Sequence, residues 1–281
     1  MAAIGWTPMT TKYFQGFVSL GLLVLLSACG GGSGPDLSVA AEGVSYSQKA
    51  SLTLAGNDLP RVGKVTVSKC SGLAVDATST TTQKTLTCTV NGTGPLQVDL
   101  KDADGNVLFT KTFVVPEPRV SMTTSLGTLV VELNPTAAPV TVNNFLAYVS
   151  AGFYTNTLIH RVVPGFVAQG GLLTTAPAVQ TGLRDPIALE SQNGLSNTRG
   201  SIGMARTSVP NSATSQYYFN LVDNTGLNYV SATQPGYAVF GKVVQGLDVM
   251  DAIGSVATGS KYGLNDYPLT DVVVLSVRQV Q

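Results

Sequence analysis

Residues 160–171 read HRVVPGFVAQGG, and this stretch decides the fold of the C-terminal part of the chain. It begins inside a segment, Leu158–Val162, that we expect to be a β-strand. The sequence on both sides remains mostly β, with short apolar or alternating runs separated by turn residues. We therefore expect further strands at Leu129–Leu133, Ile202–Ala205, Tyr217–Val222, Tyr237–Val243 and Val272–Val277.

Two segments of this region have helical periodicity instead. The first starts near Pro139, ends near Gly152 and carries one apolar stripe at positions i, i+3, i+4 and i+7. The stripe consists of Val142, Phe145, Leu146 and Val149. The second segment, Leu247–Ile253, is short and is stopped by Gly254. Many strands with two helices in about 160 residues predict a closed β-barrel that is capped at its ends.

Four blocks of the sequence resemble the motifs of the cyclophilins. They are residues 160–171 (HRVVPGFVAQGG), 197–206 (NTRGSIGMAR), 215–220 (SQYYFN) and 236–243 (GYAVFGKV). The blocks follow the family order within residues 119–281, and four ordered blocks are far more specific than a lone short motif. Their spelling is similar to that of the bacterial periplasmic branch.

The resemblance implies a fold that is mainly β, an eight-stranded antiparallel barrel with two helices. It also implies peptidyl-prolyl cis–trans isomerase activity on proline-containing polypeptides, without a cofactor or a metal ion. Rotation about an X–Pro bond must break amide resonance, with a barrier of about 18–20 kcal/mol, and unaided it takes tens to hundreds of seconds. No covalent nucleophile is needed for this reaction.

By the resemblance, the catalytic residues are Arg161, Phe166 and Gln169. In the twisted transition state the prolyl nitrogen loses conjugation and becomes a better hydrogen-bond acceptor. A fixed donor aimed at that nitrogen therefore binds the transition state more tightly than the planar amide. Arg161 suits this role because its guanidinium is a rigid fork of donors that stays charged at any working pH. The other interpretation of Arg161 is a surface salt bridge.

The resemblance also assigns substrate-binding residues: Val167, Ala205, Arg206, Gln216, Tyr218, Leu227 and Tyr237. The apolar members are expected to grip the proline ring together with Phe166. The two glutamines, Gln169 and Gln216, are expected to orient Arg161 and the substrate backbone. The segment 205–206 is expected to lie along the extended peptide, and the Tyr218 hydroxyl must find a partner or water.

Two further positions need interpretation: one departs from the family pattern, and the other could be mistaken for a catalytic residue. Gly226 stands where relatives keep an aromatic residue, which implies an open pocket edge and weak cyclosporin binding. His160 is the only histidine of the chain. Because the mechanism needs no proton transfer, we interpret His160 as a buried structural residue and not as a general base.

Residues 36–115 are predicted to form a separate small all-β domain, an immunoglobulin-like sandwich. Apolar residues alternate in several runs: Val65 and Val67; Leu86, Cys88 and Val90; Leu96, Val98 and Leu100; Val107, Phe109 and Phe113. Asn91-Gly92 and Asp104-Gly105 are hairpin-type turns. Residues 116–118, Pro-Glu-Pro, form a short linker to the isomerase-like domain, residues 119–281.

Cys70 and Cys88 are expected to form a disulfide in an oxidising compartment. Cys70 has the opposite strand parity from Val65 and Val67, so a bulge or a strand end must intervene. The functional alternative is a redox-active pair, which the absence of a close C-x-x-C spacing disfavours.

The N-terminus has the order of a secretory signal over residues 1–28: Lys12, an apolar run at Phe17–Leu26, then small residues. The run is too short to span a bilayer, which takes about 20 residues. Residues 26–29, LSAC, resemble the bacterial lipoprotein cleavage box. This resemblance implies lipidation of Cys29, a flexible tether over residues 29–35, and an envelope location with the folded part in the periplasm. Because Gly30 and not Asp follows the cysteine, the outer membrane is the expected membrane.

Composition limits the partners. The 281 residues include 16 Lys+Arg and 16 Asp+Glu, and only 11% are charged, so the basic face that nucleic-acid binding requires is not expected. We expect a monomeric, lipid-anchored isomerase of exported or envelope proteins. The alternative is a non-catalytic cyclophilin-like module that binds peptides or acts as a scaffold.

Overall fold

A computed structural model describes residues 34–175 and 177–281 of the chain. The expected signal peptide (1–28), Cys29 and most of the tether lie outside these ranges. Within them, no helix combines the length and the apolar content needed to cross a membrane.

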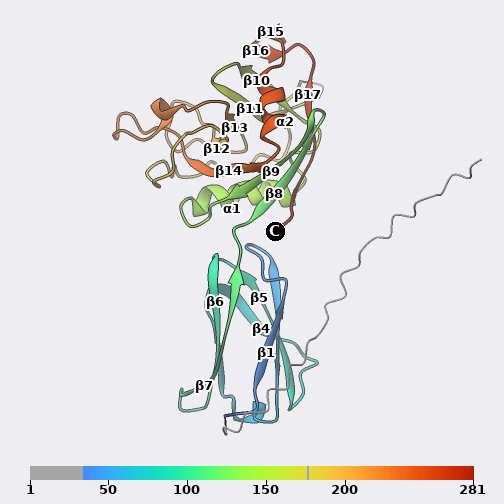
Figure 1. Ribbon diagram of the computed structural model, residues 1–281, viewed down its shortest axis with the longest axis vertical. Coiled ribbons are helices and arrows are strands. Elements are labelled where there is room, and N and C mark those ends of the chain that lie inside the picture. The colour runs from blue at the N-terminus through green and yellow to red at the C-terminus, as the bar shows by residue number, and fades with distance from the viewer. Residues whose placement is uncertain (1–33, 176) are drawn as a thin grey trace, which may run out of the picture. The chain divides into compact units, whose positions relative to one another are not determined.

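The N-terminal part of the described chain is a sandwich of two antiparallel sheets (Figure 1). One sheet has the order β1-β2-β5-β4, formed by Ser38–Glu42, Lys49–Ala55, Gln83–Val90 and Cys70–Val75. The other has the order β3-β6-β7, formed by Lys64–Val67, Gly94–Lys101 and Val107–Val115. A 3-10 turn, η1 (Leu59–Arg61), precedes β3. These are the ABED and CFG orders of an immunoglobulin constant-type domain, so the predicted sandwich is confirmed.

Alternation along the strands forms the core of this sandwich, as predicted. The inward residues of β5 and β6 are all buried: Leu86, Cys88, Val90, Leu96, Val98 and Leu100. Phe109 and Phe113 of β7 pack partly buried against them. Val107 does not follow the prediction: it is 55% exposed, because it is the first residue of β7 after the turn.

One of the two predicted hairpin turns is wrong. Asp104-Gly105 does connect the paired strands β6 and β7, and Gly105 has a φ of 90° that favours glycine. Asn91-Gly92 instead lies between β5 and β6, which belong to different sheets. The segment crosses from one sheet to the other and the Asn91 amide donates to the Lys69 carbonyl. A turn dipeptide describes only local bending, so it cannot distinguish a hairpin from a crossing.

Cys70 and Cys88 form a disulfide between the adjacent strands β4 and β5, with Cα atoms 5.7 Å apart. The parity problem is solved by a strand end: β3 stops at Val67, Lys69 has a φ of 54°, and β4 begins in the other sheet. Cys88 is 2% exposed. Burial of this kind is typical of a structural disulfide and argues against the redox alternative.

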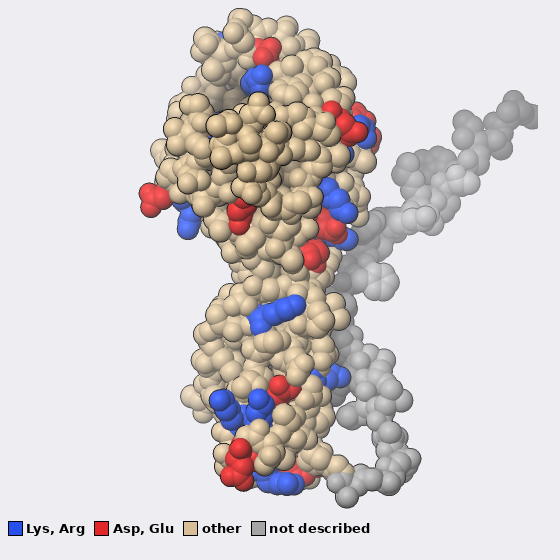
Figure 2. Space-filling model, turned by 90° about the vertical axis from the view of Figure 1, so that its left-hand side faces the viewer, with Lys and Arg blue, Asp and Glu red and all other residues tan. Residues whose placement is uncertain are grey.

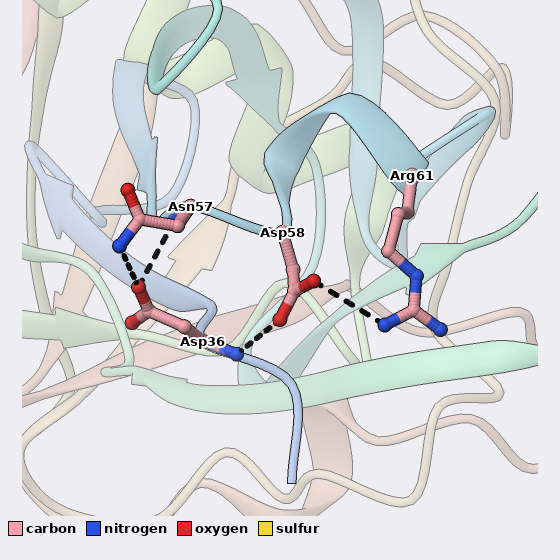
Figure 3. Close-up of polar contacts among 4 residues, drawn as sticks. All are labelled: Asp36, Asn57, Asp58 and Arg61. Atoms are coloured by element: carbon pink, nitrogen blue, oxygen red, sulfur yellow. Dashed lines mark hydrogen bonds and ion pairs between the residues drawn. The ribbon is translucent and has the colours of Figure 1, made fainter.

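A small polar cluster holds the start of the sandwich (Figure 3). The Asp36 carboxylate accepts hydrogen bonds from the Asn57 backbone amide (3.0 Å) and side-chain amide (2.8 Å). The Asp36 amide donates to the Asp58 carboxylate at 2.7 Å, and Asp58 pairs with Arg61 at 3.3 Å. The hydrogen bond from the Asp36 amide, followed by that from Arg61, lowers the pKa of Asp58. The chain is thereby attached to the sandwich from Asp36 onward.

The C-terminal part is a closed eight-stranded barrel, as predicted. Its order is β10-β11-β13-β12-β14-β9-β8-β17, and neighbouring strands are antiparallel throughout. The strands are β8 (Arg119–Thr124), β9 (Gly127–Leu133), β10 (Thr157–Val163), β11 (Val167–Thr174), β12 (Ser201–Met204), β13 (Tyr217–Asn220), β14 (Val239–Gln245) and β17 (Val272–Gln279).

Two helices lie against the barrel strands (Figure 1). They are α1 (Pro139–Ser150) and α2 (Leu247–Gly254), close to the predicted bounds. The whole predicted stripe of α1 is buried. Phe145 from this stripe packs against Tyr154, Tyr217 and Phe240, with ring centroids 5.2–6.0 Å apart. This aromatic cluster fills the barrel core and leaves the binding residues to the outer face of the strands.

A two-stranded hairpin, β15 (Thr258–Lys261) and β16 (Leu264–Pro268), was not predicted. Its turn, Tyr262-Gly263, has φ values of 55° and 77°, the conformation of a type I′ turn. The hairpin contacts β10.

Candidate active site

A surface cavity of about 120 Å³ gathers nine of the ten predicted catalytic and substrate-binding residues. Its lining is Arg161, Phe166, Val167, Gln169, Ala205, Arg206, Tyr218, Leu227 and Tyr237. They come from strands β10, β11 and β13, from the turn between β10 and β11, from the segment after β12, from the 3-10 turn η2 (Thr225–Leu227) and from the loop before β14. Residues separated by up to 76 positions in the chain, Arg161 to Tyr237, therefore meet in one concave surface.

The strand register explains why these side chains meet. Arg161 of β10 pairs with Gln169 of β11, which pairs with Tyr218 of β13, which pairs with Gly203 of β12. Directly paired residues of antiparallel strands present their side chains on the same face. The four residues therefore form one row across the outside of the barrel.

Gly203 is a functional position that sequence reasoning missed. A Cβ atom there would lie 2.3 Å from Cζ of Tyr218. The absence of a side chain therefore lets the Tyr218 ring lie across β12 and form the floor of the cavity. The available signal was a glycine inside a strand, which often marks a close approach.

The Tyr218 hydroxyl finds its partner beneath the cavity. It donates to Oδ1 of the fully buried Asn197 at 2.6 Å. Asn197 Oδ1 also accepts from Asn220 at 3.1 Å, and the Asn197 side-chain amide donates to Asn228 at 3.0 Å. Burial raises the pKa of Tyr218 well above its ordinary value, so the hydroxyl stays protonated and keeps donating. The ring presents its apolar surface to the cavity.

Gln169 and Gln216 contact each other: the Gln169 side-chain amide donates to Oε1 of Gln216 at 2.9 Å. Gln216 does not line the proline-sized cavity. It lies behind Gln169, where it lines a neighbouring hollow with His160 and Arg161. Gln216 therefore holds Gln169 in place, and only Gln169 faces the cavity.

Arg206 and Tyr237 close the opposite wall. The Arg206 guanidinium donates to the Gly236 carbonyl at 2.7 and 3.0 Å and to the Thr207 carbonyl at 2.8 Å. It also lies 4.5 Å from the centroid of the Tyr237 ring. Its donors are committed to this loop, so Arg206 acts as a brace between the 205–206 segment and Tyr237.

Arg161 has a partner that the sequence did not reveal. Among the described residues, it forms an ion pair with Asp266 of β16, in which Nε of Arg161 lies 3.5 Å from Oδ2 of Asp266. Both side chains are partly exposed, 37% for Arg161 and 45% for Asp266. No sequence motif marks Asp266, because the contact depends on how the unpredicted hairpin folds against β10.

His160 is buried, as predicted, and it is absent from the lining of the proline-sized cavity. Burial is the main cause that lowers the pKa of His160, and the nearby Arg161 charge acts in the same direction. The imidazole is therefore neutral near pH 7. This state fits the predicted structural role.

Gly226 lies in η2 beside Leu227, and a Cβ atom built on it would contact nothing within 4 Å. The expected open edge is thus present next to the cavity.

Figure 2 shows a surface in which scattered charges of both signs interrupt mostly uncharged residues. In the cavity, the Arg161 guanidinium lies beside an apolar slot. This combination suits a neutral, ring-shaped group next to a polar backbone.

The C-terminal part of the chain is similar to known proteins. Residues 119–279 match the family model of the cyclophilin type peptidyl-prolyl cis-trans isomerases. The peptidyl-prolyl cis-trans isomerase cyp18 of Streptomyces antibioticus is 47% identical over 57% of this chain and 96% of its own length. Isomerase B of Escherichia coli is 45% identical over 56% of this chain and 97% of its own length.

One solved structure is a cyclophilin type isomerase of Cryptosporidium parvum, crystallised in the presence of the dipeptide Ala-Pro. It is 24% identical, covers 58% of this chain and 99% of its own, and aligns with a TM-score of 0.49.

Proposed function

The chain belongs to the cyclophilin-type peptidyl-prolyl cis–trans isomerases and has their activity, and we propose that Arg161 performs catalysis by stabilising the twisted prolyl amide. The proline ring occupies the apolar slot formed by Phe166, Val167, Tyr218 and Leu227. Its nitrogen then faces the guanidinium.

The physical argument concerns the difference between two states of the substrate. A planar amide delocalises its nitrogen lone pair, so a donor near that nitrogen gains little. At a quarter turn the lone pair is localised and accepts a hydrogen bond. A donor that is already in place stabilises only this state, and the barrier falls accordingly.

The observation that carries the proposal is the cross-strand row. Arg161, Gln169 and Tyr218 are direct neighbours in the sheet register, and they border one cavity. Because β-strands are rigid elements, they hold the backbone of Arg161 at a fixed distance from the apolar slot, which is one requirement for a preorganised donor.

The test is Arg161→Ala in a protease-coupled assay with a proline-containing tetrapeptide. We expect kcat/KM to fall by about 10²-fold, the usual effect of removing one transition-state donor. Arg161→Lys should recover only part of this loss, because the ammonium lacks the planar fork. Arg199→Ala, which removes an arginine paired with Asp251 at 2.7 Å, is the matched control and should be neutral. Equal rates for the wild type and Arg161→Ala would contradict the proposal and favour the peptide-binding scaffold alternative.

We further propose that the protein is a lipoprotein of the bacterial envelope that assists exported proteins. Support comes from the order of Lys12, the apolar run and the LSAC box that ends at Cys29. Acyl chains on Cys29 would hold the protein at the membrane through about 0.8 kcal/mol per buried CH₂. The outer membrane is the proposed destination, the periplasm the proposed compartment of the folded part, and a monomer the proposed state.

This second proposal is tested by metabolic labelling with radioactive palmitate, followed by fractionation. The wild type should carry label and remain with outer-membrane vesicles, whereas Cys29→Ala should carry no label. Equal labelling of both, or the wild type in the soluble fraction, would contradict it.

A further inference from the structure

Asp266 occupies an irregular position of the hairpin β15–β16. Gly259 pairs with Tyr267 and Lys261 pairs with Leu264, so the register shifts between these two pairs. Two residues of β16, Asn265 and Asp266, thus stand opposite the single Ser260 of β15. This is a β-bulge, and such bulges often redirect a side chain next to an active site.

The backbone of Asp266 shows the effect of the bulge. Its φ is 57°, in the left-handed region that Asp and Asn tolerate better than other side chains. At this point Oδ2 reaches to 3.5 Å from Nε of Arg161.

The hairpin itself is held firmly beside β10 (Figure 1). Tyr267 is 1% exposed and packs with the buried Leu158 and Leu173. Asp271 accepts from Lys261 at 3.0 Å and from the Tyr267 hydroxyl at 3.3 Å. Asp266 therefore projects from a support that the barrel positions, and the carboxylate is not on a loose loop.

The contact also selects which donors of Arg161 remain for the substrate. The ion pair with Asp266 is at Nε, the nitrogen closest to the aliphatic stem, and at 3.5 Å it is an electrostatic contact and not a hydrogen bond. The two terminal amino groups are left to the cavity, which Arg161 lines. Gln169, which the resemblance implied as the orienting partner, instead donates to Gln216.

We propose that Asp266 is a positioning residue for prolyl isomerisation, which orients the Arg161 guanidinium by holding its Nε. The inference rests on the catalytic role proposed above for Arg161. Exposed ion pairs stabilise proteins little, so the effect of Asp266 falls on the geometry of Arg161 and not on folding. Loss of this orientation affects the twisted transition state more than the planar bound substrate.

The experiment compares Asp266→Ala and Asp266→Asn with the wild type in the full chain. We expect kcat/KM to fall about tenfold for Asp266→Ala. Asp266→Asn tolerates the same φ and retains an acceptor for Nε, so it should retain more activity. The Kd for an Ala-Pro tetrapeptide, measured by NMR titration, should change by less than about twofold in both variants. A parallel rise in Kd would overturn the proposal.

Asp271→Asn is the matched control. It removes the negative charge that pairs with Lys261, keeps an oxygen acceptor for the Tyr267 hydroxyl, and leaves the Arg161–Asp266 pair in place. It should retain wild-type kcat/KM. A loss as large as that of Asp266→Ala would mean that the hairpin acts only as a scaffold, and the proposal would be wrong.

The double variant Arg161→Ala/Asp266→Ala separates this inference from the proposed function. If Asp266 acts through Arg161, the double variant is no slower than Arg161→Ala alone. Additive losses overturn the inference. A neutral Arg161→Ala would instead reject the proposed function itself, whereas a slow Arg161→Ala with a fully active Asp266→Ala rejects only the role of Asp266.

Discussion

Arg161 and His160 are neighbours in β10 with opposite environments. Arg161 borders the cavity, and an arginine keeps its charge at every pH at which proteins fold. His160 is 7% exposed, and its side chain carries the one group of β10 that titrates near neutral pH. The protonation state of this strand therefore affects stability and not the proposed chemistry.

The stability of the folded protein should depend on pH through His160. Burial keeps the pKa of His160 below its ordinary value, so the folded protein binds this proton more weakly than the unfolded chain does. Acidification through the unfolded value near 6.5 therefore favours the unfolded state, and the free energy of unfolding should fall between pH 7.5 and 5.5. Urea unfolding measures this change. His160→Phe should flatten the slope, and a single imidazole NMR signal with a midpoint above 6.5 would contradict the prediction.

At the scale of elements, the sequence blocks predicted the row of Arg161, Gln169 and Tyr218 because these three residues lie in regular strands. Arg161, Gln169 and Tyr218 need only their strand register to meet. Asp266 was missed because its position depends on a bulge and on a left-handed φ, which nothing in Leu264–Pro268 announces. Asn197 was missed as a partner of Tyr218 for a related reason: a buried hydrogen bond joins two blocks across strands and has no local pattern.

The turn η2 is the element in which this chain departs most from the motif. The open space around Gly226 leaves the rim beside Leu227 unfilled. Gly226→Trp should place an indole at this rim, since its Cβ atom would meet nothing within 4 Å, and an aromatic contact contributes about 0.5–1.5 kcal/mol beyond its buried area. We expect cyclosporin to inhibit the wild type weakly and Gly226→Trp about tenfold more strongly, since 1.4 kcal/mol is a factor of ten.

The coupled isomerase assay with a cyclosporin titration measures this change, and Gly226→Ala is the control that adds no ring. Unchanged inhibition of Gly226→Trp would contradict the prediction and show that a side chain at position 226 does not reach the binding surface.

At the scale of the whole molecule, the sandwich and the barrel contain different functional features. The sandwich contains the disulfide, and none of the residues that line the proline-sized cavity belongs to it. Sequence patterns predicted both folds because alternation is strong in β5, β6 and β9. They could not predict the route between the sheets at Asn91, since inter-sheet crossings depend on packing of strands distant in the sequence.

Removal of the disulfide should therefore lower stability and leave catalysis intact. The bridge spans 18 residues, a loop size for which the chain-entropy model gives about 3 kcal/mol. Cys70→Ala/Cys88→Ala should lower the free energy of unfolding of the sandwich by about this amount in urea. Its kcat/KM at 25 °C should stay within about twofold of the wild type. A larger loss of activity in the folded double variant would mean that the sandwich contributes to the isomerase site.

Closure of the barrel has a further consequence for an isomerase that acts on proline-containing peptides. Every strand of the barrel is hydrogen-bonded to a neighbouring strand on both sides, so the barrel has no free edge strand. An extended segment of a client cannot add itself as an extra strand, which is the usual first step of aggregation between β-rich chains. The proline of the peptide enters a slot on the outer face of the barrel and does not become part of its sheet. The peptide can therefore dissociate after each rotation without breaking hydrogen bonds between barrel strands.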